Sequence, residues 1–202
     1  MTPDVLHLCA PALPPVSRET IRLYMGQRTP DGETDALMEE CLAMMRPTLA
    51  GRVLWARFSL RETADGLDLG FTTTRSADLR RHLAGCREAV LFAATLGMGP
   101  DRLILREGRL SPARALCCQA IGAERIEALC ESFCGALSQK LGPTRPRYSP
   151  GYGDWPLAVQ TDVFRALDCP RRLGLTLTES LLMSPTKSVT AIVGLENQEN
   201  DT

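Results

Sequence analysis

The chain has 202 residues, 44% of them hydrophobic and 23% charged, which is the composition of a globular protein with room for one sizeable core. Lysine plus arginine (23) against aspartate plus glutamate (24) gives a net charge of -1, which leaves no basic excess for binding nucleic acid. No run approaches the roughly 20 apolar residues of a membrane helix, and the N-terminus lacks a signal-peptide pattern. We therefore expect a cytoplasmic protein that has neither a nucleic acid nor a membrane as its partner.

The sequence predicts one domain with two short ends. Residues 1–16 are proline-rich and aperiodic and predict an N-terminal arm, residues 17–195 carry the periodic segments, and residues 196–202 predict a polar tail. Eight cysteines without an export signal predict free, mostly buried thiols and no disulfide framework.

The N-terminal third predicts two helices followed by two strands. Helical spacing of apolar residues predicts helices over 17–26 and 34–47, the second capped by Thr34. Two alternating runs over 53–60 and 67–74, separated by an Asp-Gly turn, predict an antiparallel hairpin.

The middle of the chain predicts a short helix from Ser76, a buried strand over 89–97, and a long helix over 111–140. Gly122 marks a candidate break in that long helix.

The C-terminal part begins with an aperiodic segment over 142–156 that is dense in proline, glycine and aromatic residues. A helix over 161–168, capped by Thr161, and strands over 173–178 and 188–195 are expected to follow it. Because helices and strands mix without a regular βαβ alternation or an internal repeat, the predicted class is α+β.

Histidine and cysteine chemistry finds little support in the sequence. His7 and His82 are the two histidines, and neither sits beside a plausible ligand set. Cys130 and Cys134 are four residues apart on one helix face, but a third cysteine at the usual short spacing is missing. We expect core thiols, no metal site, and no side chain acting as acid, base or nucleophile.

The segment 142–156 is the strongest candidate site, because a long irregular segment is either disordered or functional and its prolines and aromatics favour a fixed shape. The Arg147 guanidinium can form a bidentate pair with a carboxylate, and Gly151 lets the backbone approach a ligand closely. Tyr152 and Trp155 are expected to offer flat faces. From these residues alone, a packed surface loop with a structural arginine is an equal alternative.

Three motifs in order carry a resemblance: RxxxGY at 147–152, LTES at 177–180 and MxPxxSV at 183–189. Together they resemble the activation domain of cobalamin-dependent methionine synthase. The resemblance is specific over 145–195 and weak over the first hundred residues. It implies a single C-shaped α+β domain in which helices pack on a mainly antiparallel twisted sheet. It also implies binding of S-adenosylmethionine, which that family uses to remethylate cobalamin after accidental oxidation.

The resemblance further implies roles for individual residues. Arg147 would hold the carboxylate of S-adenosylmethionine, the backbone around Pro150 and Gly151 would lie along the ligand, and Tyr152 would sit between ligand and corrin. Glu131, in the segment CESFCGAL, would face the ammonium or sulfonium region of the ligand. An exposed helix glutamate is the alternative for that residue.

Three more residues are implied to support the loop or to face the corrin: Trp155, Glu179 and Ser180. Lys187 is expected to be solvated. After RxxxGY the family usually continues with a proline, a cysteine and an Asp-His pair, whereas this chain reads GDWPLA over 153–158. Over 153–158, contacts with a cobalamin module are therefore expected to differ from those of the family.

The resulting functional prediction is a stand-alone activation protein that binds S-adenosylmethionine for reductive remethylation of cob(II)alamin. The cobalamin would be carried by a separate methionine synthase or corrinoid protein, and a flavodoxin-like donor would supply the electron. The chain would act by positioning the methyl sulfonium in line with cobalt. A sensor of S-adenosylmethionine and a non-catalytic interaction subunit of another corrinoid methyltransferase are the alternatives.

Overall fold

A computed structural model describes residues 5–27 and 29–196. Its centre is a four-stranded antiparallel sheet in the order β1-β2-β6-β9, formed by β1 (His7–Cys9), β2 (Arg52–Ser59), β6 (Glu88–Thr95) and β9 (Ser188–Leu195). Two small sheets flank it: β3 (Arg61–Thr63) with β4 (Gly66–Asp68) and β5 (Thr73–Thr74), and β7 (Thr176–Leu177) with β8 (Met183–Ser184).

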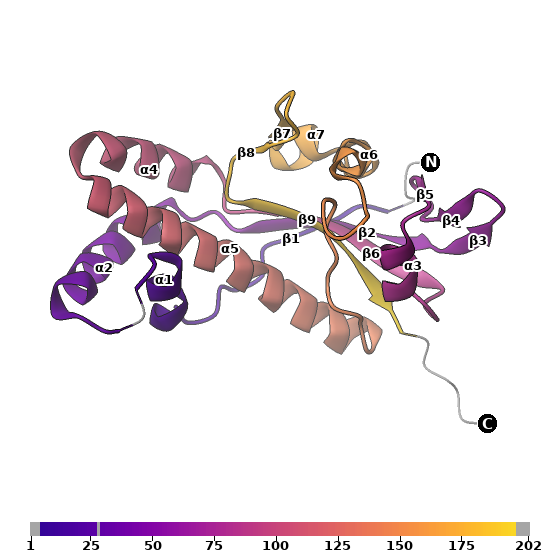
Figure 1. Ribbon diagram of the computed structural model, residues 1–202, viewed down its shortest axis with the longest axis horizontal. Coiled ribbons are helices and arrows are strands. Elements are labelled where there is room, and N and C mark those ends of the chain that lie inside the picture. The colour runs from indigo at the N-terminus through magenta and orange to yellow at the C-terminus, as the bar shows by residue number, and fades with distance from the viewer. Residues whose placement is uncertain (1–4, 28, 197–202) are drawn as a thin grey trace.

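The helices gather in two groups along an elongated molecule (Figure 1). At one end lie α1 (Arg18–Tyr24), α2 (Gly32–Met45) and α4 (Met98–Leu110), joined by the first half of the 30-residue helix α5 (Pro112–Leu141). The other helices are α3 (Ala77–His82), α6 (Gln160–Leu167) and α7 (Cys169–Leu173), with short 3-10 turns η1 (Arg46–Thr48) and η2 (Leu157–Val159).

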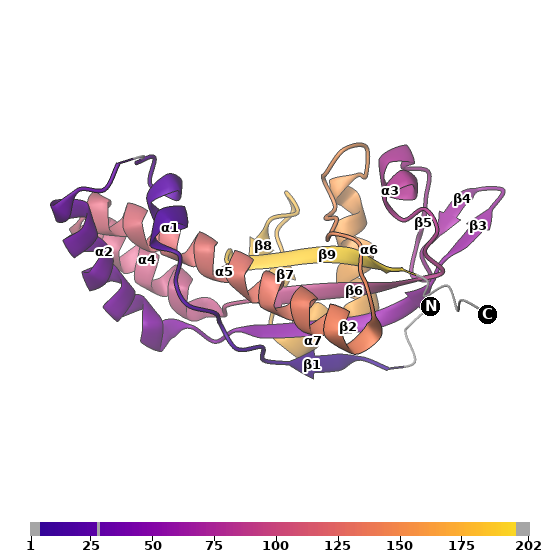
Figure 2. The ribbon, with the colours of Figure 1, turned by 90° about the horizontal axis from the view of Figure 1, so that it is seen from below.

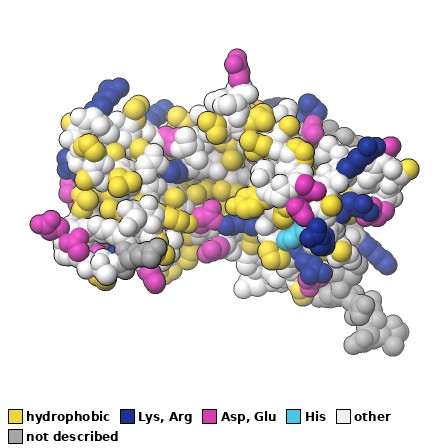
Figure 3. Space-filling view, in the orientation of Figure 1, with side chains coloured by type: hydrophobic (Ala, Val, Ile, Leu, Met, Phe, Trp, Pro, Cys, Tyr) yellow, Lys and Arg dark blue, Asp and Glu magenta, His cyan; other side chains and the backbone are white. Residues whose placement is uncertain are grey.

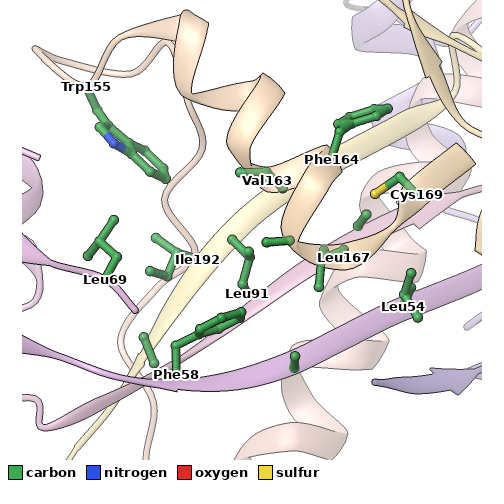
Figure 4. Packing of buried hydrophobic residues seen from close by; sticks show 14 of the residues in the cluster. Leu54, Phe58, Leu69, Leu91, Trp155, Val163, Phe164, Leu167, Cys169 and Ile192 are labelled. Atoms are coloured by element: carbon green, nitrogen blue, oxygen red, sulfur yellow. The ribbon is translucent and has the colours of Figure 1, made fainter. Parts of the chain in front are cut away.

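Both faces of the central sheet are covered, which explains why β6 and β9 are almost continuously apolar. On one face Phe92 and its neighbours pack against Leu129 and Phe133 of α5, which runs across the sheet (Figure 2). On the other face Leu91 and Ile192 pack against α6 and α7 (Figure 4). Helices and antiparallel strands therefore confirm the predicted α+β class.

The N-terminal arm is tied to α5 by polar contacts. The buried Arg125 guanidinium donates from Nη1 to the Pro14 carbonyl at 2.7 Å, and the backbone N–H of Ser17 donates to Glu124 Oε1 at 2.9 Å. Residues 7–9 of the predicted arm form β1, and residues 1–4 lie outside the described part. The predicted polar tail lies outside it as well, except for residue 196.

The predicted hairpin between 53–60 and 67–74 is wrong. Strand β2 pairs with β1 and β6, while residues 67–74 are divided between β4 and β5 of a separate small sheet. A strand that is buried on both faces is stabilised more by pairing with the apolar β6 than by pairing with the short polar run that follows it in sequence.

Several predicted boundaries also differ. Helix α4 was not predicted, α5 continues through Gly122 without a break, and residue 173 ends α7 where a strand was expected. Asp31, and not Thr34, caps α2 by accepting from Glu33 N at 3.0 Å. Helix α6 begins at Gln160 without any side-chain cap, so Thr161 lies inside it.

In the described ranges, no helix is both long and apolar enough to cross a membrane.

Candidate functional site

A groove of about 530 Å³ lies between the middle of α5, the loop over 142–156, the start of α6, the turn joining β7 to β8, and the start of β9. Figure 3 shows the molecule hollowed at its middle, between the helical end and the end that carries the loop. Pockets of 300–1,000 Å³ are the usual size for small ligands.

The loop over 142–156 is held as an extra edge on β9. Tyr148 N donates to the Ile192 carbonyl at 2.9 Å, and Ile192 N donates back to the Tyr148 carbonyl at 2.8 Å. A ring nitrogen of His82 on α3 lies 2.6 Å from the Pro146 carbonyl oxygen. Arg147 therefore stands between two fixed backbone positions.

The rest of the loop is a tight turn anchored in the core. Gly151 has a φ of +92°, which favours glycine, and its N–H donates to the Trp155 carbonyl at 2.9 Å. Asp154 caps α3 by accepting from Ala77 N at 2.7 Å and from the Ser76 hydroxyl. The predicted fixed shape of the loop is confirmed.

Trp155 is 0% exposed and packs in the cluster under α6. The expected flat face at this position is therefore wrong, because no corrin or other ligand can reach the indole. The buried Trp155 side chain instead supports the turn from the core beneath it.

The charged end of the groove is an ion pair between Arg147 Nη2 and Glu127 Oε2 on α5. Burial is the largest single influence on the Arg147 guanidinium and would lower its pKa, but the Glu127 carboxylate, together with Cys130 and Cys134, raises the pKa above its usual value. Both side chains remain partly exposed, so a ligand could reach either group.

The opposite part of the groove is polar but uncharged. Gln160, buried at the start of α6, donates from Nε2 to the Leu181 carbonyl at 3.2 Å and accepts from Thr190 Oγ1 at 3.2 Å. Leu181 has a φ of 63°, which is uncommon for a non-glycine residue, and it lines the groove with the next residues of the turn after β7.

Apolar side chains stand at the groove mouth. Tyr152 on the loop is 67% exposed, and Leu182 on the β7–β8 turn is 65% exposed. A groove with a charged end, a largely apolar lining and an exposed apolar mouth is suited to a small ligand that a larger partner then covers.

The structure brings some of the predicted site residues together and leaves others apart. Arg147, Pro150 and Tyr152 line the groove, and Gly151 forms the turn between them. Glu131 lies on the exposed surface of α5, one turn beyond Glu127, and does not line the groove. Its ligand-facing role stays a prediction.

Glu179 and Ser180 are exposed in the turn after β7. The Ser180 hydroxyl lies 3.0 Å from that of Thr178, and it is the next residues, over 181–183, that line the groove. The supporting role expected of these two residues stays a prediction.

The sequence interpretation missed Glu127, Gln160 and residues 181–183 as groove residues. Glu127 and Glu131 are four residues apart and share a helix face, so only the position of Arg147 decides between them. Gln160 was overlooked because the predicted helix began one residue later.

Lys187 is half-buried, so the expectation that it is solvated is wrong. Its Nζ donates to Gln119 Oε1 at 2.6 Å, and its methylenes cross α5 at Gly122, where an added Cβ would lie 2.8 Å from Cε. Burial lowers the pKa of this amine. Gly122 therefore leaves room for the lysine that joins β9 to α5.

The cysteines are free. Burial raises the pKa of the Cys130 thiol to about 12 and also raises the pKa of Cys134. Over 5–27 and 29–196, no group of three or more histidine, cysteine or acidic side chains is placed to hold a metal ion.

Comparisons with known proteins address the same region. A family model described as the activation domain of vitamin B12 dependent methionine synthase matches residues 144–200, from the loop through β9. No curated protein sequence matches the chain.

A solved structure described as the MetH reactivation domain bound to AdoHcy has a TM-score of 0.67 and 16% sequence identity, covering 100% of this chain and 83% of that one. At this identity the likeness establishes the fold. The chain thus resembles the activation domain of vitamin B12 dependent methionine synthase, as its motifs predicted.

Proposed function

We propose that the groove binds S-adenosylmethionine and that the chain serves as an activation component for a cobalamin-dependent methionine synthase. The observation that carries this proposal is the Arg147–Glu127 ion pair at one end of a groove lined by the RxxxGY loop. The family match covers that loop, and the structural neighbour is bound to AdoHcy, the product that remains when S-adenosylmethionine has lost its methyl group.

The donor set of the groove fits such a ligand. Among the described residues, Arg147 uses only Nη2 for hydrogen bonding, so its other N–H groups are available to a carboxylate. Glu127 can accept from the neighbouring ammonium. The uncharged part around Gln160 and Thr190 offers the amide and hydroxyl groups that suit a nucleoside.

In the proposed reaction, the role of this chain is to position the ligand. S-adenosylmethionine supplies the methyl group, and cobalamin on the partner supplies the cobalt that accepts it. Arg147 and Glu127 hold the amino-acid end, the turn at Gly151 fixes the loop along the ligand, and Tyr152 at the rim excludes water once the partner is in place. No side chain of the chain transfers a proton in this scheme.

The proposed partner is a separate cobalamin-carrying methionine synthase or corrinoid protein, and a flavodoxin-like protein would supply the electron for cob(II)alamin. Tyr152 and Leu182 support such a docking, since each exposes an apolar side chain at the groove mouth.

Isothermal titration of the protein with S-adenosylmethionine tests the binding. We expect saturable binding that weakens about 10- to 150-fold in Arg147→Ala, because a charge-assisted hydrogen bond contributes about 1.5–3 kcal/mol. Arg145→Ala is the matched control, since Arg145 pairs with Glu196 and lies outside the groove lining. Absence of binding by the wild-type protein would exclude the proposed function.

A reactivation assay tests the role. Oxidised cobalamin-dependent methionine synthase without its own activation domain should regain turnover when this protein, S-adenosylmethionine and a reductant are all present. Omitting S-adenosylmethionine is the control. If binding is found but turnover does not return, the remethylation role is wrong and a sensor of the same ligand becomes the better explanation.

A further inference from the structure

Strand β9 is the outer strand of the central sheet, and only part of its outer edge is paired. The Gly194 carbonyl accepts from the loop over 142–156 at 2.9 Å, and Ile192 exchanges two hydrogen bonds with Tyr148. In an antiparallel strand, alternate residues direct both of their backbone groups to the same side. Thr190 and Ser188 continue this alternation, so their N–H and carbonyl groups point to the same outer edge.

The loop stops pairing with β9 immediately before Thr190. Continuing the register of Tyr148 with Ile192 would place Pro150 opposite Thr190. A proline has no N–H to donate, and the loop enters its tight turn at this point. Among the residues that the structure describes, none forms a hydrogen bond with the backbone groups of Thr190 or Ser188 along this edge.

Thr190 places the unpaired edge inside the groove. It lines the groove together with Glu127 of α5, and its side-chain hydroxyl donates to Gln160 Oε1 of α6 at 3.2 Å. Only 2% of Thr190 is exposed, so its backbone groups have little access to water. A buried backbone group without a partner is costly. A ligand with a donor beside an acceptor would remove that cost.

The length of the unpaired edge suits one flat ring. It spans residues 188–190, about 7 Å at the usual rise of a strand, and it lies between the loop at Tyr148 and the turn over 178–187. An added peptide strand is commonly five or six residues long and would need more edge than this. Pro150, Leu157 and Met183 also line the groove and offer apolar contacts to the faces of a ring.

We infer that the backbone of Thr190 binds the 6-amino edge of adenine and selects adenine nucleosides over 6-oxo purines. This inference rests on the proposed function, because S-adenosylmethionine carries an adenine. The amino group at C6 donates to the Thr190 carbonyl, and a neighbouring ring nitrogen accepts from the Thr190 N–H. Hypoxanthine has a carbonyl at C6 and cannot donate there. Its ring cannot turn over to compensate, since Arg147 and Glu127 hold the amino-acid end.

Titration of the wild-type protein with two nucleosides tests this selection. AdoHcy and S-inosylhomocysteine share the ribose and the amino-acid end and differ only in the base. We expect S-inosylhomocysteine to bind about 5- to 150-fold more weakly, because a bidentate contact with a base discriminates by that factor.

Amide exchange followed by NMR tests the same atoms in the wild-type protein. The Thr190 N–H should exchange more slowly once AdoHcy is bound. The Ile192 N–H is the internal control, because it already donates to the Tyr148 carbonyl at 2.8 Å and should change less.

A pair of variants isolates the Thr190 N–H. Thr190→Pro removes it and Thr190→Val keeps it, while both lose the hydroxyl contact with Gln160. Since this N–H points away from β6, proline removes no hydrogen bond of the central sheet. We expect Thr190→Pro to bind AdoHcy about 2- to 13-fold more weakly than Thr190→Val, the effect of one hydrogen bond. Equal thermal midpoints show that the two variants are comparably folded.

The outcomes separate this inference from the proposed function. Equal wild-type affinity for AdoHcy and S-inosylhomocysteine overturns the inference and leaves the function intact. A Thr190 N–H whose exchange is unchanged by AdoHcy does the same. A wild-type protein that binds no AdoHcy overturns the function and the inference together. If Thr190→Pro does not fold, the two wild-type measurements decide the inference without it.

Discussion

The loop over 142–156 and the turn over 178–187 form opposite lips of the groove, and they are held by different kinds of contact. The loop is bonded to β9 through backbone groups at Tyr148 and is fixed from beneath by the buried Trp155. Backbone pairing and core packing leave it little freedom.

The opposite lip is held by side chains from distant elements. Gln160 reaches the Leu181 carbonyl at 3.2 Å, Asp101 accepts from Thr186 N at 2.7 Å, and Lys187 reaches Gln119. Between these anchors the turn is closed by the two residue pairs of β7 and β8 and by local backbone hydrogen bonds, from Thr178 N to the Leu182 carbonyl at 2.9 Å and from Leu181 N to the Thr178 carbonyl at 2.9 Å. The comparison indicates that the loop is the rigid side of the groove, whereas the turn can be altered without disturbing the core.

The largest effect is expected from Trp155→Ala. Removing a fully buried tryptophan should lower the free energy of unfolding by about 3–5 kcal/mol, a large share of the stability of a typical domain. Urea unfolding followed by circular dichroism measures it. On the other lip, Leu182→Ala should stay within about 0.5 kcal/mol of wild type, since the side chain is largely exposed. Equal losses at both positions would remove the contrast between the lips.

An intermediate effect is expected from Gln160→Leu. The substitution leaves the Leu181 carbonyl and the Thr190 hydroxyl without their partner, which should cost about 1–3 kcal/mol. Hydrogen exchange should become faster in the turn after β7 and stay slow at Tyr148 on the loop. Thr190→Ser, which keeps the hydroxyl, serves as the control. Faster exchange in both lips would show that Gln160 supports the whole groove.

The sequence predicted the loop better than the turn for a physical reason. Proline fixes φ, and glycine permits the positive φ that a tight turn needs, so the fixed shape around Arg147 and Gly151 could be predicted from neighbouring residues. The contacts of the turn join residues far apart in the chain, such as Gln160 with Leu181 and Lys187 with Gln119. No local sequence pattern indicates these long-range contacts.

The same distinction between local patterns and long-range contacts explains which parts of the fold could be predicted. The long helix and the strands over 53–60 and 188–195 carry periodic apolar patterns, and they were predicted close to their true positions. The pairing of β2 with β6 and the choice of Glu127 over Glu131 both depend on tertiary packing. Trp155 was expected at the surface because aromatic residues in a loop do not reveal which side of it is buried.

The smallest effect is expected from Asp154→Asn and depends on pH. The Ser76 hydroxyl, with the backbone N–H groups of Ala77 and Asp78, holds the pKa of Asp154 below its usual value of 3.8. A lowered pKa in the folded state contributes stability above the usual pKa, and this contribution is lost as the pH falls through the lowered value. The wild type should therefore be more stable than Asp154→Asn near neutral pH, and the difference should shrink below pH 3.8.

Asp31→Asn is the matched control for this prediction. Asp31 also caps a helix and its pKa is also lowered, first through the Thr34 hydroxyl, but it belongs to α2 at the far end of the molecule (Figure 1). Both variants should show the same trend of stability with pH, while only Asp154→Asn should change the fluorescence of Trp155, which follows Asp154 in the loop. An unchanged fluorescence in Asp154→Asn would mean that core packing of Trp155 alone fixes the loop, without help from the cap on α3.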